Sequence, residues 1–399
     1  MRAFLAAFAL QCVVALPFAA QSKPRSRDLG VPLDGTPGLL NAITDVAGVE
    51  VGVTTIIAGE GKLETGKGPV RTGVTAILPR GKASGAEVYA AWFTLNGNGE
   101  MTGTTWVEES GLLGGPVMIT NTHSVGIVHD AVIEWVVQKG KAFAWSLPVV
   151  AETWDGGLND INGFHVTREH ALAALDNAKS GPVPEGNVGG GTGMVCHQFK
   201  GGTGTSSRRI TILGTGYTVG VLVQCNYGGR PRLSVAGVPV GMEIADLLPC
   251  FARLSDGGYA GQPTCELGPG GDLGTEGSII VVIATDAPLL PHQLKRVVKR
   301  AALGIGRMGG IGGDSSGDIF LAFSTANPNA STTNQLLQVT AIPNDVINPV
   351  FEATIDATSE AILNAMLAAD TMTGANGRRV YALPHDRLIA ALRKYGRIE

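Results

Sequence analysis

The sequence has few charged residues and no long basic run. Only 16% of its 399 residues are charged, and 30 Lys and Arg against 34 Asp and Glu give a formal net charge of −4. Proteins that bind nucleic acid normally present a basic face or stripe, so this composition argues against a nucleic-acid partner. The length and the hydrophobic content of 44% suit one large core or a pair of closely packed layers.

The residue spacings that usually hold a metal ion are also missing. The five cysteines form no CxxC pair, and no HExxH segment occurs. His165 and His170 are five residues apart, which is the wrong step for one face of a helix. We therefore expect neither a metal nor another cofactor.

The sequence leaves the pairing of the cysteines open. Cys12 lies near the N-terminus, and the others are Cys196, Cys225, Cys250 and Cys265. Their even number would allow disulfides in an oxidising compartment. Because Cys225 lies inside an apolar run, we expect it to be a small buried hydrophobic residue.

The N-terminus has the pattern of an export signal. Arg2 precedes an apolar stretch, Ala3–Ala20, that ends in small residues. Gln11 and Pro17 interrupt this stretch, so it is too short to span a bilayer comfortably as an anchor. We expect residues 1–20 to be a signal peptide, with the cut position open, and the mature chain to be secreted into the periplasm without a membrane anchor.

Short apolar runs alternate with helical patterns along the chain, which indicates mixed α and β layers. Strands are expected at residues 74–78, 88–94, 117–120, 147–151, 209–213, 218–225, 279–284 and 319–324. Helices are expected at residues 125–139, 168–177, 294–303 and 350–369.

A loop-rich segment separates the two halves of this pattern. Pro, Gly, Asp and Ser accumulate between residues 230 and 276, most densely at 255–275, which predicts an exposed loop. It runs directly into the apolar strand 279–284. Such a junction is a place where a chain can be cut without loss of the fold.

Two short motifs match known sites by spacing alone. Gly61–Lys67 has the spacing of a phosphate-binding loop, but Gly68 stands where the Mg²⁺-binding hydroxyl belongs. Gly313–Gly317 matches GxSxG, but a predicted helix precedes it and a predicted strand follows. That order is the reverse of a nucleophile elbow, so neither motif predicts a site.

Gly277 and Ser278 stand where the loop meets the strand. A serine hydroxyl is a weak nucleophile that needs a nearby base. If Ser278 were the first residue of a chain, its own α-amino group would titrate near neutral pH and could act as that base. Gly277 lacks Cβ, which would let the bond before Ser278 adopt strained φ/ψ values that favour attack by the serine hydroxyl on the preceding carbonyl. By pattern alone, such a pair is more often a simple turn.

Longer segments give this pair a context. Gly277–Leu289 resembles the cleavage-site segment of the DmpA-type aminopeptidases, the peptidase family that includes the β-peptidyl aminopeptidases. Other segments, ordered along about residues 30 to 395, resemble the same family: Gly68–Ala76, Gly97–Gly103, Pro148–Thr153, Leu158–Asn162, Val223–Gly228 and Ser316–Ser324.

The resemblance implies an α+β fold, a four-layer αββα sandwich similar to N-terminal-nucleophile hydrolases. It also implies a precursor that cuts itself at Gly277–Ser278 into a large subunit, residues 21–277, and a small one, residues 278–399. The two would form one folded unit and assemble as a homotetramer. Members release N-terminal L-, D- or β-amino acids from short peptides, amides and esters.

The resemblance also implies roles for single residues. Ser278 matches the nucleophile, and Ser316 and Asp318 match the pair that contacts its hydroxyl and amine. Asn226 matches the oxyanion-hole amide, whose N–H suits a developing negative charge. By pattern alone, Ser316 would cap a turn and Asn226 would be a turn residue.

Two further matches concern the substrate. Glu152 follows an apolar run and matches the acid that holds the substrate's ammonium group; its alternative is a solvated charge at a strand end. Trp154 stands where some relatives have Tyr. An indole offers an apolar wall and one N–H but no hydroxyl, which puts a Tyr-like role in doubt.

Two other functions stay open. One is a self-processing acyltransferase of the ornithine acetyltransferase type, although those enzymes use a threonine where this chain has Ser278. The other is a processed binding protein with a vestigial site. The sequence does not decide between α-L, α-D and β-aminoacyl substrates.

Overall fold

A computed structural model describes residues 23–140, 145–252, 265–266 and 277–399. The predicted signal peptide and most of the predicted loop at 255–275 lie outside the described residues. Within the described ranges, no helix has the length and apolarity that a membrane crossing needs.

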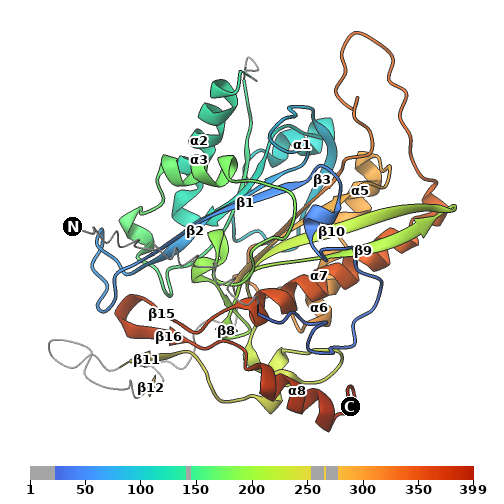
Figure 1. Cartoon of the computed structure of the whole chain (residues 1–399). Helices are drawn as coiled ribbons and strands as arrows, with labels where there is room; N and C mark the ends of the chain where they lie inside the picture. The colour runs from blue at the N-terminus through green and yellow to red at the C-terminus, as the bar shows by residue number, and fades with distance from the viewer. Residues whose placement is uncertain (1–22, 141–144, 253–264, 267–276) are drawn as a thin grey trace, which may run out of the picture.

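Apolar strands build two central β-sheets (Figure 1). The first has the order β1-β2-β5-β6, with β1 at Glu50–Ala58, β2 at Val70–Leu78, β5 at Val117–Asn121 and β6 at Val149–Thr153. The second has the order β4-β3-β14-β13-β10-β9, with β4 at Leu112–Leu113, β3 at Val88–Thr94, β14 at Asp318–Ser324, β13 at Ser278–Thr285, β10 at Thr215–Asn226 and β9 at Gly202–Ile212.

The alternation of side chains along β13 shows how the layers stack. All its residues are buried. Ile280 and Val282 pack between the two sheets, with residues such as Ile119 of the first sheet. Ile279 and Val281 face the other way, into a core shared with helices. Because successive side chains of a strand point to opposite faces, this apolar strand needs cover on both sides, and a layered sandwich supplies it.

Helices cover the two outer faces. On the first sheet lie α2 (Val125–Gln138) and α3 (Arg168–Asp176), which share a core with β2. On the second lie α5 (Pro291–Val298), α6 (Ala301–Arg307) and α7 (Asn348–Ala368); Figure 1 shows α7 alongside β9 and β10. A short helix, α1 (Thr104–Ser110), follows β3. The predicted four-layer αββα sandwich is confirmed.

Smaller elements complete the chain. A third sheet has the order β12-β11-β16-β15, with β12 at Cys265–Glu266, β11 at Cys250–Ala252, β16 at Arg378–Val380 and β15 at Met372–Thr373. The remaining elements are β7 (Val195–Cys196), β8 (Phe199–Lys200), α4 (Val240–Glu243) and α8 (His385–Lys394).

The structure differs from the sequence-based expectations in several elements. The helix expected at 294–303 is two helices, because α5 packs on β3 whereas α6 packs on α7. The strand expected at 209–213 is the end of the longer β9. Neither β1 nor α8 was predicted. Cys225 is not a free hydrophobic residue: it forms a disulfide with Cys196, with the two Cα atoms 5.7 Å apart.

Candidate active site

Strand register brings the predicted catalytic residues to one end of the second sheet. Ser278, the first residue of β13, pairs with Asn226, the last residue of β10. On its other side β13 runs parallel to β14, which places Asp318 beside Ile279. Residues distant in sequence therefore meet because these strands start or end at the same edge.

The hydroxyl of Ser278 lies beside the bond predicted to be cut. Ser278 is 7% exposed, and its Oγ accepts a hydrogen bond from the backbone N–H of Gly317 at 3.0 Å. The hydroxyl of Ser316 donates to the carbonyl oxygen of Gly277. A donor on that oxygen stabilises the negative charge that develops when a nucleophile attacks the carbonyl carbon.

Ser316 links this carbonyl to a buried acid. Its Oγ lies 2.6 Å from Oδ1 of Asp318. Burial raises the pKa of Asp318, and hydrogen bonds from Ser316, the Ile279 backbone and Asn96 offset this only in part. Serine has a single O–H donor, so Ser316 bonds both oxygens at once only when Asp318 holds a proton. The raised pKa favours that state.

Gly277 is required for a steric reason. A Cβ at this position would lie 2.1 Å from the backbone oxygen of Asn226, so no side chain fits there. Its φ is not in the positive range. The structure therefore gives a different reason for glycine here than the expected strained φ/ψ values: the close approach of β13 and β10.

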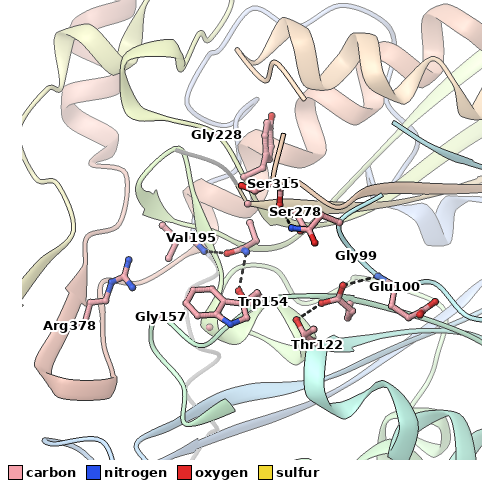
Figure 2. Close-up of a pocket in the computed structure, with 16 residues that line it drawn as sticks. Gly99, Glu100, Thr122, Trp154, Gly157, Val195, Gly228, Ser278, Ser315 and Arg378 are labelled. Carbon is pink, nitrogen blue, oxygen red and sulfur yellow. Dashed lines mark hydrogen bonds between the residues drawn. The ribbon is translucent and has the colours of Figure 1, made fainter. Parts of the chain in front are cut away.

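Hydrogen bonds on both sides fix the amide of Asn226. Its Nδ2 donates to the carbonyl of Trp154 at 3.0 Å, and its Oδ1 accepts from the N–H of Val195 at 2.8 Å. Figure 2 shows both bonds beneath Ser278. Among the described residues, the second N–H of this amide has no acceptor, which leaves it for an oxyanion.

Glu152 is a buried carboxylate, not the solvated strand-end charge that was its alternative. It is 3% exposed within β6. Its oxygens accept from the hydroxyl of Thr122 and from the N–H of Glu100 at 2.9 Å. Burial raises its pKa above the ordinary glutamate value. No cation pairs with it among the described residues, so the site has an unmatched negative charge at this point.

Trp154 forms a wall on the same cavity. It is 53% exposed, and its ring lies over Gly156 and Gly157, where added Cβ atoms would be 2.6 Å and 3.6 Å from it. The next residue, Asp155, is buried and accepts from Asn159 at 3.0 Å. Burial raises the pKa of Asp155 to about 7.

One cavity of about 440 Å³ unites most of the predicted site. Its lining includes Gly277, Ser278, Asn226, Glu152 and Trp154. Ser316 and Asp318 line an adjacent cavity of about 320 Å³, which also touches Gly277. The nucleophile's bond to Gly277 thus lies between a substrate-sized cavity on one side and the Ser316–Asp318 pair on the other.

The cavity also contains residues that the sequence did not single out. Thr122 and Glu100 hold Glu152, and Arg378 lines the cavity. Glu100 falls within Gly97–Gly103, a segment that resembles the family, so the sequence marked this segment but not the residue itself. Arg378 lies in a short strand that no pattern predicted. Within the described part of the chain, no group of three or more His, Cys, Asp and Glu could hold a metal ion.

Fold and site together define a class. A serine at the start of a buried strand, a sandwich of two sheets between helices, and an amide opposite the serine are the parts of a serine hydrolase of the N-terminal-nucleophile type. The chain belongs to peptidase family S58, whose model matches residues 41–380.

Known relatives agree with this assignment. The chain is 59% identical over 381 residues to the β-peptidyl aminopeptidase BapA of Sphingosinicella microcystinivorans, covering 95% of this chain and 94% of that protein. It is 50% identical over 376 residues to BapA of Sphingosinicella xenopeptidilytica, covering 93% and 91%. The structure of the L-aminopeptidase D-Ala-esterase/amidase of Ochrobactrum anthropi, a variant of the Ntn hydrolase fold, superposes with a TM-score of 0.85 at 48% identity, covering 94% of this chain and 100% of that one.

The predicted serine aminopeptidase is thereby confirmed.

Proposed function

We propose that the chain cuts itself between Gly277 and Ser278, and that Ser278 then removes N-terminal residues from short peptides and amides. One observation carries this proposal: the hydroxyl of Ser316 donates a hydrogen bond to the carbonyl oxygen of Gly277. Gly277 is the residue directly before Ser278, whose hydroxyl is itself fixed by a hydrogen bond from the N–H of Gly317. A carbonyl polarised next to a serine hydroxyl is set up for an acyl shift.

In the self-cleavage that we propose, Oγ of Ser278 attacks the carbonyl carbon of Gly277. The C–N bond breaks, the proton from Oγ passes to the nitrogen of Ser278, and an ester results. Water then hydrolyses the ester, which leaves a carboxylate on Gly277 and a free amine on Ser278. Residues 278–399 would become the small subunit and residues 21–277 the large one. Since β13 and β14 pair with β10 and β3, the two would stay hydrogen-bonded.

Peptide hydrolysis would use the same serine with a different electrophile. The substrate's ammonium group pairs with Glu152, which forms no ion pair with any residue that the structure describes. Ser278 attacks the first carbonyl and its amine takes the proton, with Ser316 and Asp318 relaying it. Asn226 donates its remaining N–H to the oxyanion, and Trp154 forms the wall. The leaving amine departs with the proton, and water or an acceptor amine takes the acyl group.

We extend the substrate range to β-amino acids because two relatives at 59% and 50% identity are β-peptidyl aminopeptidases. The test is a panel of α-L, α-D and β-aminoacyl anilides, with and without an acceptor amine, after N-terminal sequencing of the purified protein. We expect a fragment that starts at Ser278, and we expect anilide hydrolysis that does not require an acceptor amine. Release only with an acceptor would indicate an acyltransferase. An intact, fully active chain would refute self-cleavage.

We also propose that the mature enzyme is periplasmic and tetrameric. The Cys196–Cys225 disulfide supports an oxidising compartment, and the pattern of residues 1–20 supports export. Cell fractionation tests the first point, and light scattering of the processed protein tests the second. Activity confined to the cytoplasm, or a mass other than that of four αβ units, would refute them.

A further inference from the structure

Arg378 brings an unpaired positive charge to the substrate cavity. It lines the cavity together with two acidic residues, Glu100 and Glu152. No acidic side chain or other hydrogen-bond acceptor contacts its guanidinium among the described residues, and its Nε is buried without a partner. Arg378 as a whole is half-buried, and a partly desolvated charge without a counter-ion is unfavourable, so a structural role alone gives no reason for this charge.

The position of Arg378 is fixed by the hairpin that carries it. β15 and β16 are tied to the loop after β6 by the N–H of Ala375, which donates to the carbonyl of Leu158 at 2.8 Å. Arg71 donates to the carbonyl of Thr373 at 2.9 Å. Leu158, Met372 and Val380 form a small core beneath the hairpin. The guanidinium is therefore anchored beside the cavity and not at the end of a free loop.

A glycine leaves the space that the guanidinium occupies. A Cβ on Gly157 would lie 2.7 Å from Nη1 of Arg378 and 3.6 Å from the ring of Trp154. The guanidinium thus lies close to the indole wall, and both groups border the space that a side chain on Gly157 would enter. In Figure 2, Arg378 lies across Trp154 and Ser278 from Thr122 and Glu100, the residues that hold Glu152.

The cavity therefore contains both a carboxylate and a guanidinium, and in the view of Figure 2 Arg378 lies on one side of Ser278 and Thr122 and Glu100, which hold the carboxylate, lie on the other. An aminopeptidase substrate bound with its ammonium group at Glu152 extends its leaving group past Ser278, away from Glu152. Burial lowers the pKa of Arg378, and a bound anion would oppose this shift. Arginine suits carboxylates because its planar fork donates two parallel hydrogen bonds.

We propose that Arg378 binds the free carboxylate of the leaving amino acid and so makes the enzyme selective for dipeptides and similarly short peptides. This inference rests on the proposed function, because Glu152 must hold the other end of the substrate. In a dipeptide the carboxylate is next to the scissile bond; in longer peptides an amide takes its place.

The test compares three substrates with one acyl residue: a dipeptide, the same dipeptide with its C-terminus amidated, and an anilide. Arg378→Gln should lower the ratio of kcat/KM for acid over amide by about 10- to 100-fold, mainly through KM, as expected for a charge-assisted pair. Arg378→Lys should keep part of the ratio. Arg379→Gln is the matched control: Arg379 is the next residue of the strand, lies over the ring of Tyr381 and is not part of the cavity lining, so the ratio should not change.

A second variant, Gly157→Ala, tests the same inference if Arg378→Gln folds poorly. In Gly157→Ala the new methyl group would displace the guanidinium while its charge remains, and the acid-over-amide ratio should also fall. An unchanged ratio in both variants, or no preference for the acid in the wild type, overturns the inference. Failure of the proposed function looks different: the wild type would then hydrolyse none of the three substrates or show no fragment starting at Ser278.

Discussion

Glu152→Gln tests the proposed binding of the substrate's ammonium group, because the substitution removes the negative charge of the side chain and keeps its shape. The carbonyl oxygen of the variant amide can still accept from the N–H of Glu100, and its NH2 group can donate to the hydroxyl of Thr122, the two groups that now donate to the carboxylate. What it loses is the attraction for a substrate ammonium group. N-acetylated substrates carry no such group, so the change should discriminate between the two.

The size of the loss follows from the burial of Glu152. At about 3 Å and an effective dielectric of about 20, an ammonium and a carboxylate attract by about 5–6 kcal/mol. The hydration that both groups give up cancels part of this, and breaking such pairs costs about 2–5 kcal/mol. We expect kcat/KM for substrates with a free amine to fall by about 30- to 1000-fold, which corresponds to about 2–4 kcal/mol.

The pH profile gives a second readout. Only the ionised carboxylate attracts the ammonium group, so protonation of Glu152 weakens binding as the pH falls. Because burial raises its pKa, activity should decline on the acidic side at a higher pH than an ordinary glutamate would give. In Glu152→Gln the acidic limb should become shallower, because only the amine of Ser278, which must be unprotonated to accept a proton, still titrates there.

The assay measures kcat/KM on an aminoacyl anilide and on its N-acetyl form, together with the melting temperature. The melting temperature should not fall, because the variant removes a buried carboxylate that has no ion-pair partner in the described part of the chain. Glu100→Gln is the control, since that side chain is exposed at the same cavity and should cost little. Equal losses on both substrates with a lower melting temperature would show that Glu152 only supports the fold.

Three further predictions concern the nucleophile and its surroundings. Ser316→Ala should slow self-cleavage, which is measured as the fraction of intact chain on a gel. Asn226→Ala should still be cut, but the processed enzyme should hydrolyse its substrate slowly. The reverse pattern would exchange the roles of the two residues. In the processed fraction, Asp318→Asn should lower kcat by about 10²–10⁴-fold, and near-normal turnover would make it structural. Burial raises the pKa of Asp155 from 3.8 to about 7, so its contribution to folding is present below pH 4 and lost as the pH rises to 7. In the uncut Ser278→Ala chain, Asp155→Asn should remove a fall of about 2–3 kcal/mol between pH 5 and 7, read from urea midpoints, and an unchanged slope would contradict this.

The layers and most central strands could be predicted because apolar runs report burial directly. The segment at 279–284 is apolar at every position, and β13 is indeed buried on both faces. β1 escaped prediction because its burial is uneven along the strand, with its second half largely exposed. The division of 294–303 into α5 and α6 depends on two different packing partners, which periodicity within one segment does not contain.

The site could be predicted only as far as its segments resemble a known family. Ser278, Asn226 and Asp318 meet through the register of three strands, which spacing along the chain does not reveal. The Cys196–Cys225 disulfide was missed for a related reason: an apolar strand hides whether a cysteine has a partner across the fold. Arg378 gave no signal, because its meaning comes from the cavity that it faces.

The two proposed reactions place opposite demands on one serine, and the geometry separates them. The carbonyl of Gly277 faces Ser316 and Asp318, whereas a substrate held at Glu152 would reach Ser278 from the main cavity. Once the bond is cut, the pair loses that carbonyl and gains a free amine as its neighbour. A group that exchanges a proton with an amine titrating near neutrality works best when its own pKa is not far below. Burial, which makes Asp318 an unfavourable permanent anion, therefore suits it to proton transfer in both reactions.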